Sequence, residues 1–227
     1  MNTLLKRLMD ILCSALALVV LSPIFIISAI IIKLSSRGPV FYKASRIGRD
    51  GKQFSMYKFR SMHVENSAAE GSFIADADRI FAFGNFMRKS KIDELPQLIN
   101  ILLGDMSVVG PRPASSVNAD ELYSGEYKKI QDVKPGLTSY ASLFDYKHGE
   151  LFVSDNDTYI KEILPVRLEL ELYYVKVWNV FKDWGLVFST VLVILQIIFG
   201  KKKFHYTNIE QNAIDKIATV DIRSEVL

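Results

Sequence analysis

An apolar segment near the N-terminus, residues 11–32, most constrains what this chain can fold into, because a proline interrupts it. At ~1.5 Å of rise per residue, a straight helix of that length would just cross a ~30 Å hydrocarbon core. Pro23 lies near the midpoint, where its missing N–H and its ring force a helix to kink or break. The Ser22 hydroxyl can donate to a carbonyl that the break leaves free. The sequence therefore predicts a helix broken at Ser22 and Pro23.

Basic residues flank this segment on both sides. Lys6 and Arg7 precede it, and Lys33 and Arg37 follow it. Because positive residues favour the cytoplasmic side of a membrane, both ends are expected in the cytoplasm. We therefore expect a re-entrant helix that enters and leaves one leaflet, with a true span and a buried helix of a soluble protein as the alternatives. Asp10 is expected either to pair with Arg7, three residues away on a helix, or to be solvated.

Composition favours contact with a membrane and argues against nucleic-acid binding. Hydrophobic residues make up 49% of the 227 residues, more than a soluble domain needs. The net charge of +3 is too small to indicate a nucleic-acid partner, but basic residues cluster around the apolar stretches, which suits anionic headgroups or a phosphorylated substrate. The single cysteine, Cys13, excludes an intrachain disulfide and is interpreted as a small buried hydrophobe.

The middle of the chain predicts a small β-hairpin. A β-like stretch begins at residues 40–42, a turn signal follows at residues 48–51, and residues 53–62 form the return strand. Alternation along that strand places Lys58 and Arg60 on one face.

Helical spacing follows the hairpin, over residues 79–88 and again over residues 93–103. Pro96 fits the first turn of the second helix, where its missing N–H costs nothing. Asp93 and Glu94 are then expected at the N-terminus of that helix, a location that stabilises anions.

Two further apolar patterns lie near the C-terminus. Residues 160–182 are expected to form an amphipathic helix, and the apolar run at residues 186–199 suits a helix at a membrane interface, with a core helix as the alternative. Trp178 and Trp184 precede the run, where indole rings favour the headgroup region. The predicted fold class is therefore α+β and helix-rich, a compact membrane-associated catalytic domain. Its expected parts are a re-entrant anchor at residues 1–36, a catalytic domain at residues 37–200 and a polar tail at residues 201–227.

The adjacent carboxylates of Asp93 and Glu94 are the best candidates for chemistry at phosphorus. Such chemistry needs positive charge around the phosphates, usually a divalent cation, and a nucleophile. The pair can hold Mg²⁺ through oxygen ligands, and Asp93 can attack phosphorus to form an acyl phosphate. The candidate phosphate contacts are Lys58, Arg60, Arg88 and Arg112. Taken alone, an acidic doublet is more often an exposed pair in a first helical turn.

The order of several longer motifs favours the catalytic interpretation. They are Gly38-Pro39-Val40-Phe41, Arg46-Ile47-Gly48-Arg49, Tyr57-Lys58-Phe59-Arg60-Ser61-Met62, Asp93-Glu94-Leu95-Pro96-Gln97, Val109-Gly110-Pro111-Arg112-Pro113 and Lys134-Pro135-Gly136-Leu137-Thr138. Over residues 3–195 the chain resembles the bacterial sugar transferase family, small monotopic phosphoglycosyl transferases that act on polyprenol phosphate.

This resemblance implies transfer of a sugar 1-phosphate from a UDP-sugar to undecaprenyl phosphate, with release of UMP. It implies a Mg²⁺-dependent ping-pong route in which Asp93 is the nucleophile, Glu94 is a metal ligand, and the four basic residues contact phosphate or nucleotide. It also implies a re-entrant helix broken at a Ser-Pro pair, matched by Ser22 and Pro23, and a catalytic domain on the cytoplasmic face of the bacterial inner membrane. A homo-oligomer is left open, and no nucleic-acid partner is expected.

One segment departs from the family pattern. After Thr138, relatives continue with Gly-Trp-Ala-Gln-Val-Asn-Gly-Arg, whereas this chain diverges over residues 139–150 and lacks the arginine. Whether Lys147 replaces that arginine is left open by the sequence. His148 is expected at the surface. The sugar and the final glycan stay open. The alternatives to a transferase are a membrane-anchored scaffold for glycan assembly and a metal-dependent phosphohydrolase of lipid diphosphates.

Overall fold

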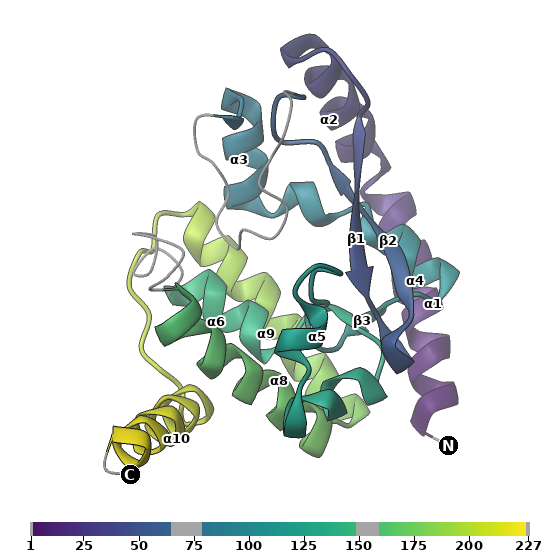
Figure 1. Ribbon diagram of the computed structural model, residues 1–227. Helices are drawn as coiled ribbons and strands as arrows, with labels where there is room; N and C mark the ends of the chain where they lie inside the picture. Colours follow the sequence, from purple (N-terminus) through teal and green to yellow (C-terminus); the bar gives the residue numbers. More distant parts are fainter. Residues whose placement is uncertain (1, 65–78, 149–158, 226–227) are drawn as a thin grey trace.

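The computed structural model describes residues 2–64, 79–148 and 159–225. Within these ranges, helices surround two sheets of two strands each (Figure 1). The predicted α+β class is confirmed, whereas membrane association stays a prediction.

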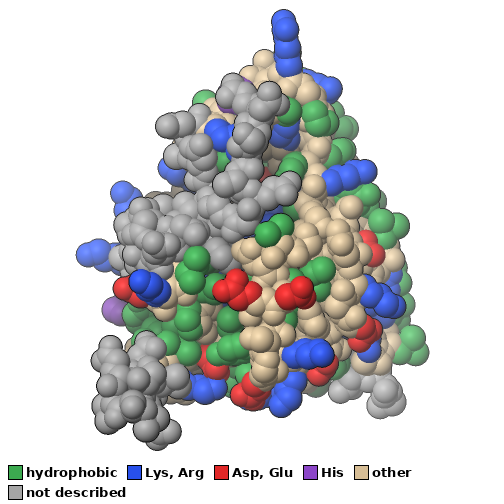
Figure 2. Space-filling model, in the orientation of Figure 1, with side chains coloured by type: hydrophobic (Ala, Val, Ile, Leu, Met, Phe, Trp, Pro, Cys, Tyr) green, Lys and Arg blue, Asp and Glu red, His purple; other side chains and the backbone are tan. Residues whose placement is uncertain are grey.

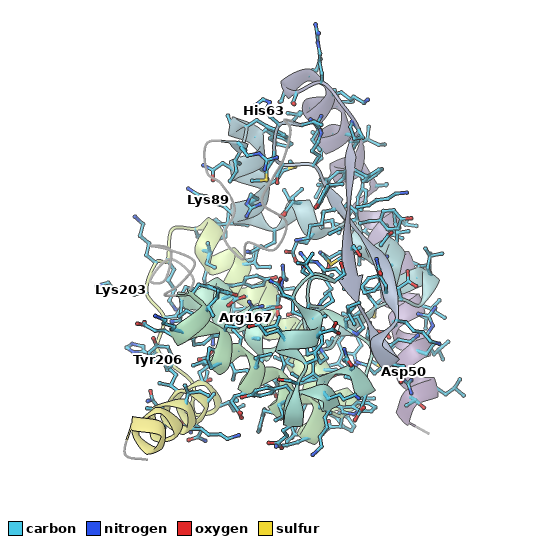
Figure 3. The ribbon with its side chains drawn as sticks, in the orientation of Figure 1. Asp50, His63, Lys89, Arg167, Lys203 and Tyr206 are labelled. Atoms are coloured by element: carbon cyan, nitrogen blue, oxygen red, sulfur yellow. The ribbon has the colours of Figure 1, made fainter. Side chains whose placement is uncertain are left out.

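The predicted hairpin is present. It consists of β1 (Phe41–Ile47) and β2 (Gln53–Phe59), paired antiparallel and joined by the short 3-10 turn η1 (Arg49–Gly51). Figure 3 places Asp50 at this turn and His63 beyond the other end of β2. The return strand ends at residue 59 instead of the predicted residue 62.

The segment that carries the acidic pair forms α3 (Ala82–Ser90), the 3-10 turn η3 (Ile92–Glu94) and α4 (Gln97–Leu103). Lys91 separates α3 from η3 with a left-handed backbone (φ 59°, ψ 15°). Pro96 is the N-cap residue of α4. The acidic pair therefore lies in a tight turn just before α4, not in the first turn of a helix that starts at residue 93.

The chain after α4 forms β3 (Ser107–Val109), α5 (Ala119–Leu122), η4 (Gly125–Asp132) and β4 (Gly136–Thr138). β3 and β4 pair in parallel. Their backbones come so close that a Cβ atom added at Gly136 would lie 2.0 Å from the backbone nitrogen of Gly110. Only glycine fits at Gly136, and the contact fixes the chain that follows β3.

The predicted break in the N-terminal helix is confirmed. α1 (Asn2–Val20) and α2 (Ser22–Ser35) meet at an angle of 60°. Pro23 lies in the first turn of α2, and the Ser22 hydroxyl donates to the Val19 carbonyl at 2.7 Å, as expected for a carbonyl freed by a break. By length and composition the bent pair fits either a broken span or a re-entrant loop, so the re-entrant path stays a prediction.

A buried carboxylate joins α1 to β3. Asp10 is 4% exposed, and its Oδ1 accepts hydrogen bonds from the Ser107 hydroxyl and the Val108 N–H, each at 2.9 Å. Both expected states of Asp10, paired with Arg7 or solvated, are wrong. Arg7 instead donates to two carbonyls of α4, at 2.6 and 2.9 Å.

The C-terminal half contains α6 (Tyr140–His148), the π-helical turn η6 (Tyr159–Ile163), α8 (Leu164–Val177) and α9 (Val180–Ile198). The single helix predicted over residues 160–182 is therefore divided. The division follows from Asn179, whose side chain accepts a hydrogen bond from the Lys182 N–H at 3.0 Å and so caps a new helix.

The apolar run at residues 186–199 belongs to a longer helix than predicted, because α9 begins at Val180 and includes Trp184. By length and composition α9 could cross a membrane, and 22% of it is buried in the structure. The large apolar side chains exposed along it are Phe181, Trp184, Phe188, Val191, Leu192, Leu195 and Ile198. Others are exposed along α1 and α2, and Figure 2 shows hydrophobic side chains on the edge of the molecule that these helices form. Placement at a membrane interface stays a prediction.

The segment predicted as a polar tail contains a packed helix, α10 (Asn208–Glu225). Its Ala213 is buried in a cluster with residues of α6 and α8. The helix begins with a capping box, in which Glu210 Oε2 accepts from the Thr207 N–H at 2.7 Å and the Thr207 hydroxyl accepts from the Glu210 N–H at 3.3 Å.

α10 also explains two residues of the divergent segment. Lys147 pairs with Glu210 at 3.1 Å, so its ammonium group points to α10. His148 is only 2% exposed, with its ring centroid 4.3 Å from that of Tyr206. The surface position expected for His148 is wrong because the C-terminal segment covers it.

Replacing Asp10 with alanine should weaken the attachment of α1. The Val108 N–H and the Ser107 hydroxyl would lose their buried acceptor, which costs about 2–3 kcal/mol of unfolding free energy. Thermal unfolding of the purified full chain should show a clear drop in Tm. Asp50→Asn, in the exposed hairpin turn, is the control and should stay within about 0.5 kcal/mol of wild type. An unchanged Tm for Asp10→Ala would contradict this role.

Candidate active site

The acidic pair is buried although it lies in a short turn. Asp93 is 6% exposed and Glu94 is 5% exposed. The turn closes through hydrogen bonds from the Glu94 N–H to the Lys91 carbonyl and from the Leu95 N–H to the Ile92 carbonyl, both 3.1 Å. Because buried carboxylates need partners, their surroundings decide what each one can do.

Glu94 is held by two cations that come from different parts of the chain. Lys58 Nζ, from β2, lies 3.0 Å from Glu94 Oε1. Arg112 donates through Nη2 to Oε1 at 2.7 Å and through Nη1 to Oε2 at 3.3 Å. This two-pronged contact is the strong geometry for a guanidinium and a carboxylate. Two of the predicted substrate contacts are therefore brought to the acidic pair.

The surroundings shift the pKa values of the two carboxylates in opposite directions. Burial would raise the pKa of Glu94, but the charges of Arg112 and Lys58 and the hydrogen bonds from Arg112 outweigh burial and hold this pKa well below its usual range. Burial and the charge of Glu94 raise the pKa of Asp93, against the opposing charges of Lys58, Lys91 and Arg88. The surroundings thus favour the anionic form of Glu94, whereas they shift the pKa of Asp93 in the opposite direction.

Asp93 also has an unused oxygen. Its Oδ1 is buried and has no hydrogen-bond partner among the described residues. The charge of Arg88, on α3, acts on this carboxyl, which brings a third predicted substrate contact toward the pair. A buried carboxylate oxygen without a hydrogen-bond partner destabilises the folded protein. Such an oxygen is typical of a functional position.

Arg60 is not brought to the acidic pair. Because β2 ends at residue 59, the Arg60 side chain leaves the face that carries Lys58. Its guanidinium donates to the carbonyls of Pro39 at 2.7 Å, Ser36 at 2.7 Å and Arg37 at 3.0 Å. The side chain thus fixes the connection between α2 and β1.

Two residues of the site were not assigned from the sequence. Lys91 Nζ lies 4.3 Å from the centroid of the Tyr146 ring, a cation–π contact next to the acidic pair. Burial lowers the pKa of Lys91, which the charge of Glu94 opposes. The left-handed turn that aims Lys91 inward has no signature in the sequence, and Tyr146 lies in the divergent segment, where the family pattern gives no guide.

Glu171, on α8, fixes the backbone of Arg112 through a hydrogen bond. Its Oε1 accepts hydrogen bonds from the Arg112 N–H and the Ser139 hydroxyl, both at 2.9 Å, whereas Oε2 has no partner among the residues described. Burial raises the pKa of Glu171 to about 7. The sequence did not single out Glu171, because a glutamate within a helix usually faces solvent.

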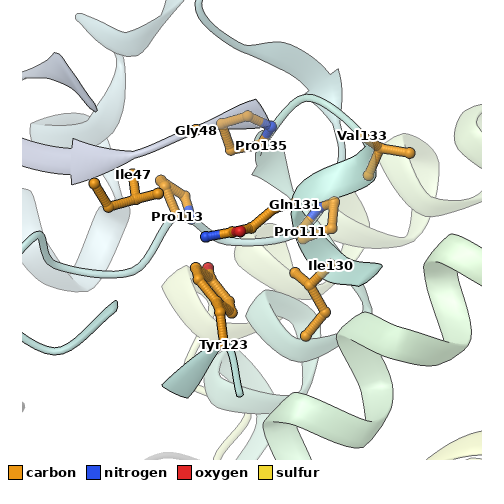
Figure 4. Close-up of a pocket in the computed structure, with 9 residues that line it drawn as sticks. All are labelled: Ile47, Gly48, Pro111, Pro113, Tyr123, Ile130, Gln131, Val133 and Pro135. Atoms are coloured by element: carbon orange, nitrogen blue, oxygen red, sulfur yellow. The ribbon is translucent and has the colours of Figure 1, made fainter. Parts of the chain in front are cut away.

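A small, partly open cavity is lined by Pro111 and Pro113, the residues on either side of Arg112 (Figure 4). Figure 4 shows the Gln131 side chain between Pro113 and Tyr123. The Tyr123 hydroxyl accepts from the Ala114 N–H at 3.0 Å. Since none of its lining residues belongs to the acidic pair or to the cations around it, this cavity borders the scaffold of the Arg112 segment and not the reacting groups.

The carboxylates of the site can bind Mg²⁺ together with substrate phosphates and water. Across the described ranges, no group of three or more His, Cys, Asp or Glu side chains is placed to hold a metal ion. Mg²⁺, however, is commonly bound by one or two carboxylates together with substrate phosphates and water. The unpartnered Oδ1 of Asp93 can serve as one ligand, and Glu94 can serve as a second where it exchanges a cation for the metal.

Glu171→Gln should change how stability depends on pH. Between pH 4.5 and about 7 the unfolded carboxyl is ionised while the buried one keeps its proton, so the unfolding free energy of the wild type falls as pH rises. The amide removes this loss, and the variant should gain about 3 kcal/mol relative to wild type between pH 4 and pH 8. Denaturant unfolding at several pH values measures the difference. A constant difference would contradict the protonated state, and the exposed Glu162→Gln control should follow the wild type.

Comparison with known proteins places the chain in a family. Residues 1–197 match the sequence model of the family described as bacterial sugar transferase. The chain is 39% identical over 194 residues to UDP-glucose:undecaprenyl-phosphate glucose-1-phosphate transferase of Escherichia coli (strain K12), covering 84% of this chain and 40% of that protein. It is 39% identical over 197 residues to UDP-N-acetylgalactosamine-undecaprenyl-phosphate N-acetylgalactosaminephosphotransferase of Aeromonas hydrophila, covering 84% of this chain and 44% of that protein.

A third relative has about the same length as the match. The exopolysaccharide production protein PSS of Rhizobium leguminosarum bv. phaseoli is 36% identical over 200 residues, covering 85% of this chain and 96% of the relative. The chain thus spans less than half the length of the first two relatives and nearly all of the third. On the match over residues 1–197 and on these identities, the chain belongs to the bacterial sugar transferase family.

Proposed function

We propose that this protein transfers a sugar 1-phosphate from a UDP-sugar to undecaprenyl phosphate, releases UMP and leaves a lipid-linked diphosphosugar, as a first membrane step in surface glycan assembly. The observation that carries the proposal is the buried acidic pair, in which Glu94 is held by Lys58 and Arg112 while an oxygen of Asp93 has no partner among the described residues. A nucleophile beside a cluster of cations suits attack on a diphosphate.

The names of the relatives support this class of reaction but not one sugar. The Escherichia coli relative is named for glucose 1-phosphate and the Aeromonas hydrophila relative for N-acetylgalactosamine phosphate, at the same 39% identity. The proposal therefore specifies a UDP-sugar without naming the sugar.

In the first step, a deprotonated Asp93 oxygen attacks the phosphorus that bears the sugar. A bond forms between this oxygen and phosphorus, the diphosphate bridge breaks, and UMP leaves with the bridging oxygen. The charges of Lys58, Lys91 and Arg88 oppose the raised pKa of Asp93, so they favour its reactive anionic form. Glu94, fixed as an anion, keeps Lys58 and Arg112 in position for the phosphates.

In the second step, an oxygen of the acceptor phosphate attacks the aspartyl phosphosugar. The bond from phosphorus to Asp93 breaks, the carboxylate returns, and the product carries both phosphates and the sugar. Because the two substrates react in turn, the soluble donor and the lipid acceptor need not occupy the site together. Mg²⁺, held by Asp93 or Glu94, would supply neutralisation of the diphosphate charge.

The exposed apolar surfaces of α1, α2 and α9 support a membrane location. A lipid acceptor requires access from the bilayer, and basic residues at both ends of the bent helix pair favour cytoplasmic headgroups. We therefore infer a re-entrant anchor and a catalytic domain on the cytoplasmic face of the inner membrane.

Asp93→Asn should reduce UMP release by about 1000-fold or more, because the amide is not a nucleophile toward phosphorus. Release is measured with a panel of UDP-sugars in the presence of undecaprenyl phosphate. Asp120→Asn, at an exposed position of α5, is the control and should match the wild type. Normal UMP release by Asp93→Asn would contradict the role of Asp93.

The same assay on the wild type separates the alternatives. A transferase forms lipid-linked diphosphosugar, whereas turnover that yields free sugar phosphate would indicate a phosphohydrolase. No turnover with any donor would favour a scaffold.

Both ends of the bent helix pair should face the cytoplasm. Asn2→Cys and Ser35→Cys, each made in a Cys13→Ser background, should react with an impermeant maleimide only after the cells are permeabilised. Labelling of one of the two cysteines in intact spheroplasts would indicate a true span.

A further inference from the structure

Arg46, near the end of β1, lies on the side of the hairpin that faces the acidic pair. Side chains alternate along a strand, so Arg46 shares a face with Ala44. Ala44 is 5% exposed and packs with Leu98 and Ile101 of α4, directly after the turn that holds Asp93 and Glu94. The opposite strand contributes Lys58 to the same face, paired with residue 42 in the register.

The Arg46 side chain is partly buried and forms no ion pair among the described residues. Its Nε is buried and unpartnered, and within the described residues neither a hydrogen bond nor an ion pair joins the guanidinium to another side chain. Burial, and next the positive charge of Arg112, lower the pKa of Arg46. Two guanidinium groups therefore lie near one another, and only that of Arg112 has a carboxylate partner.

The nearest carboxylate is already used. Glu94 accepts hydrogen bonds from Lys58 and Arg112 on both of its oxygens. A partly buried charge without an ion-pair partner is unfavourable, so an anion beside Arg46 would complete the arrangement. Guanidinium groups bind phosphate oxygens in a planar, forked geometry.

We propose that Arg46, together with Arg112, binds the nucleotide-side phosphate of the diphosphate donor, the phosphate that leaves with UMP. The positive charges with the largest effect on Asp93 are those of Lys58, Lys91 and Arg88. Arg46 lies beside the Arg112 segment instead, since its backbone is bridged to Ser115 and the Ile47 N–H donates to the Ala114 carbonyl at 3.1 Å. The attacked phosphate belongs beside Asp93, so the second phosphate is left for Arg46. This inference rests on the proposed function for the identity of the donor.

Binding measurements on the purified full chain test the subsite. Arg46→Gln should weaken UMP binding about tenfold to a hundredfold, the loss expected for a charge-assisted hydrogen bond. Without ligand, its Tm should equal or exceed that of the wild type, because the substitution removes a partly buried charge that has no ion-pair partner. Arg49→Gln is the matched control from the same hairpin, since its side chain is 52% exposed, and it should bind UMP as the wild type does.

Two further measurements distinguish a wrong assignment of the Arg46 subsite from a wrong proposed function. Inorganic pyrophosphate binding, measured in the Asp93→Asn background, needs no turnover, and its loss on adding Arg46→Gln would support the subsite even if no sugar were transferred. Unchanged UMP binding, with slower transfer to undecaprenyl phosphate alone, would overturn the proposal in favour of the acceptor phosphate. A lower ligand-free Tm together with unchanged UMP and pyrophosphate binding would also overturn it, because Arg46 would then be structural.

Discussion

The architecture of the site depends on one buried carboxylate, Glu94, and on the two cations that neutralise it. Lys58 comes from the hairpin and Arg112 from the segment after β3, and Glu94 joins both to the turn between α3 and α4. Removing Glu94 would leave both cations without their shared carboxylate, and the loss of one member of a buried ion pair is strongly destabilising. Segments far apart in the sequence are therefore held in one arrangement.

This interaction also explains why two adjacent carboxylates can have different roles. Glu94 uses both oxygens to bind cations and stays ionised, whereas Asp93 keeps a buried oxygen without a partner in the described part of the chain. The negative charge of Glu94 raises the pKa of its neighbour, and the surrounding cations oppose that effect. Neighbouring groups with pKa values shifted in opposite directions are typical of catalytic sites.

Sequence patterns predicted those features that depend on residues close together in the chain. The break at Pro23 follows from a missing N–H, the hairpin from its turn residues, and the acidic pair from a motif within a few residues. The partners of Arg60 and the burial of His148 were not predictable, because both depend on contacts between distant segments. The helix α10 was hidden in a polar composition, and only its packing against α6 and α8 reveals its apolar side.

In the proposed reaction, Asp93 holds the sugar phosphate covalently between the two substrates. Mass spectrometry of the full chain, quenched after mixing with UDP-sugars in the absence of undecaprenyl phosphate, tests this most directly. We expect one added sugar phosphate, located on the peptide that contains Asp93 and removed when the acceptor is supplied. UMP release without an adduct, or an adduct on another residue, would contradict it.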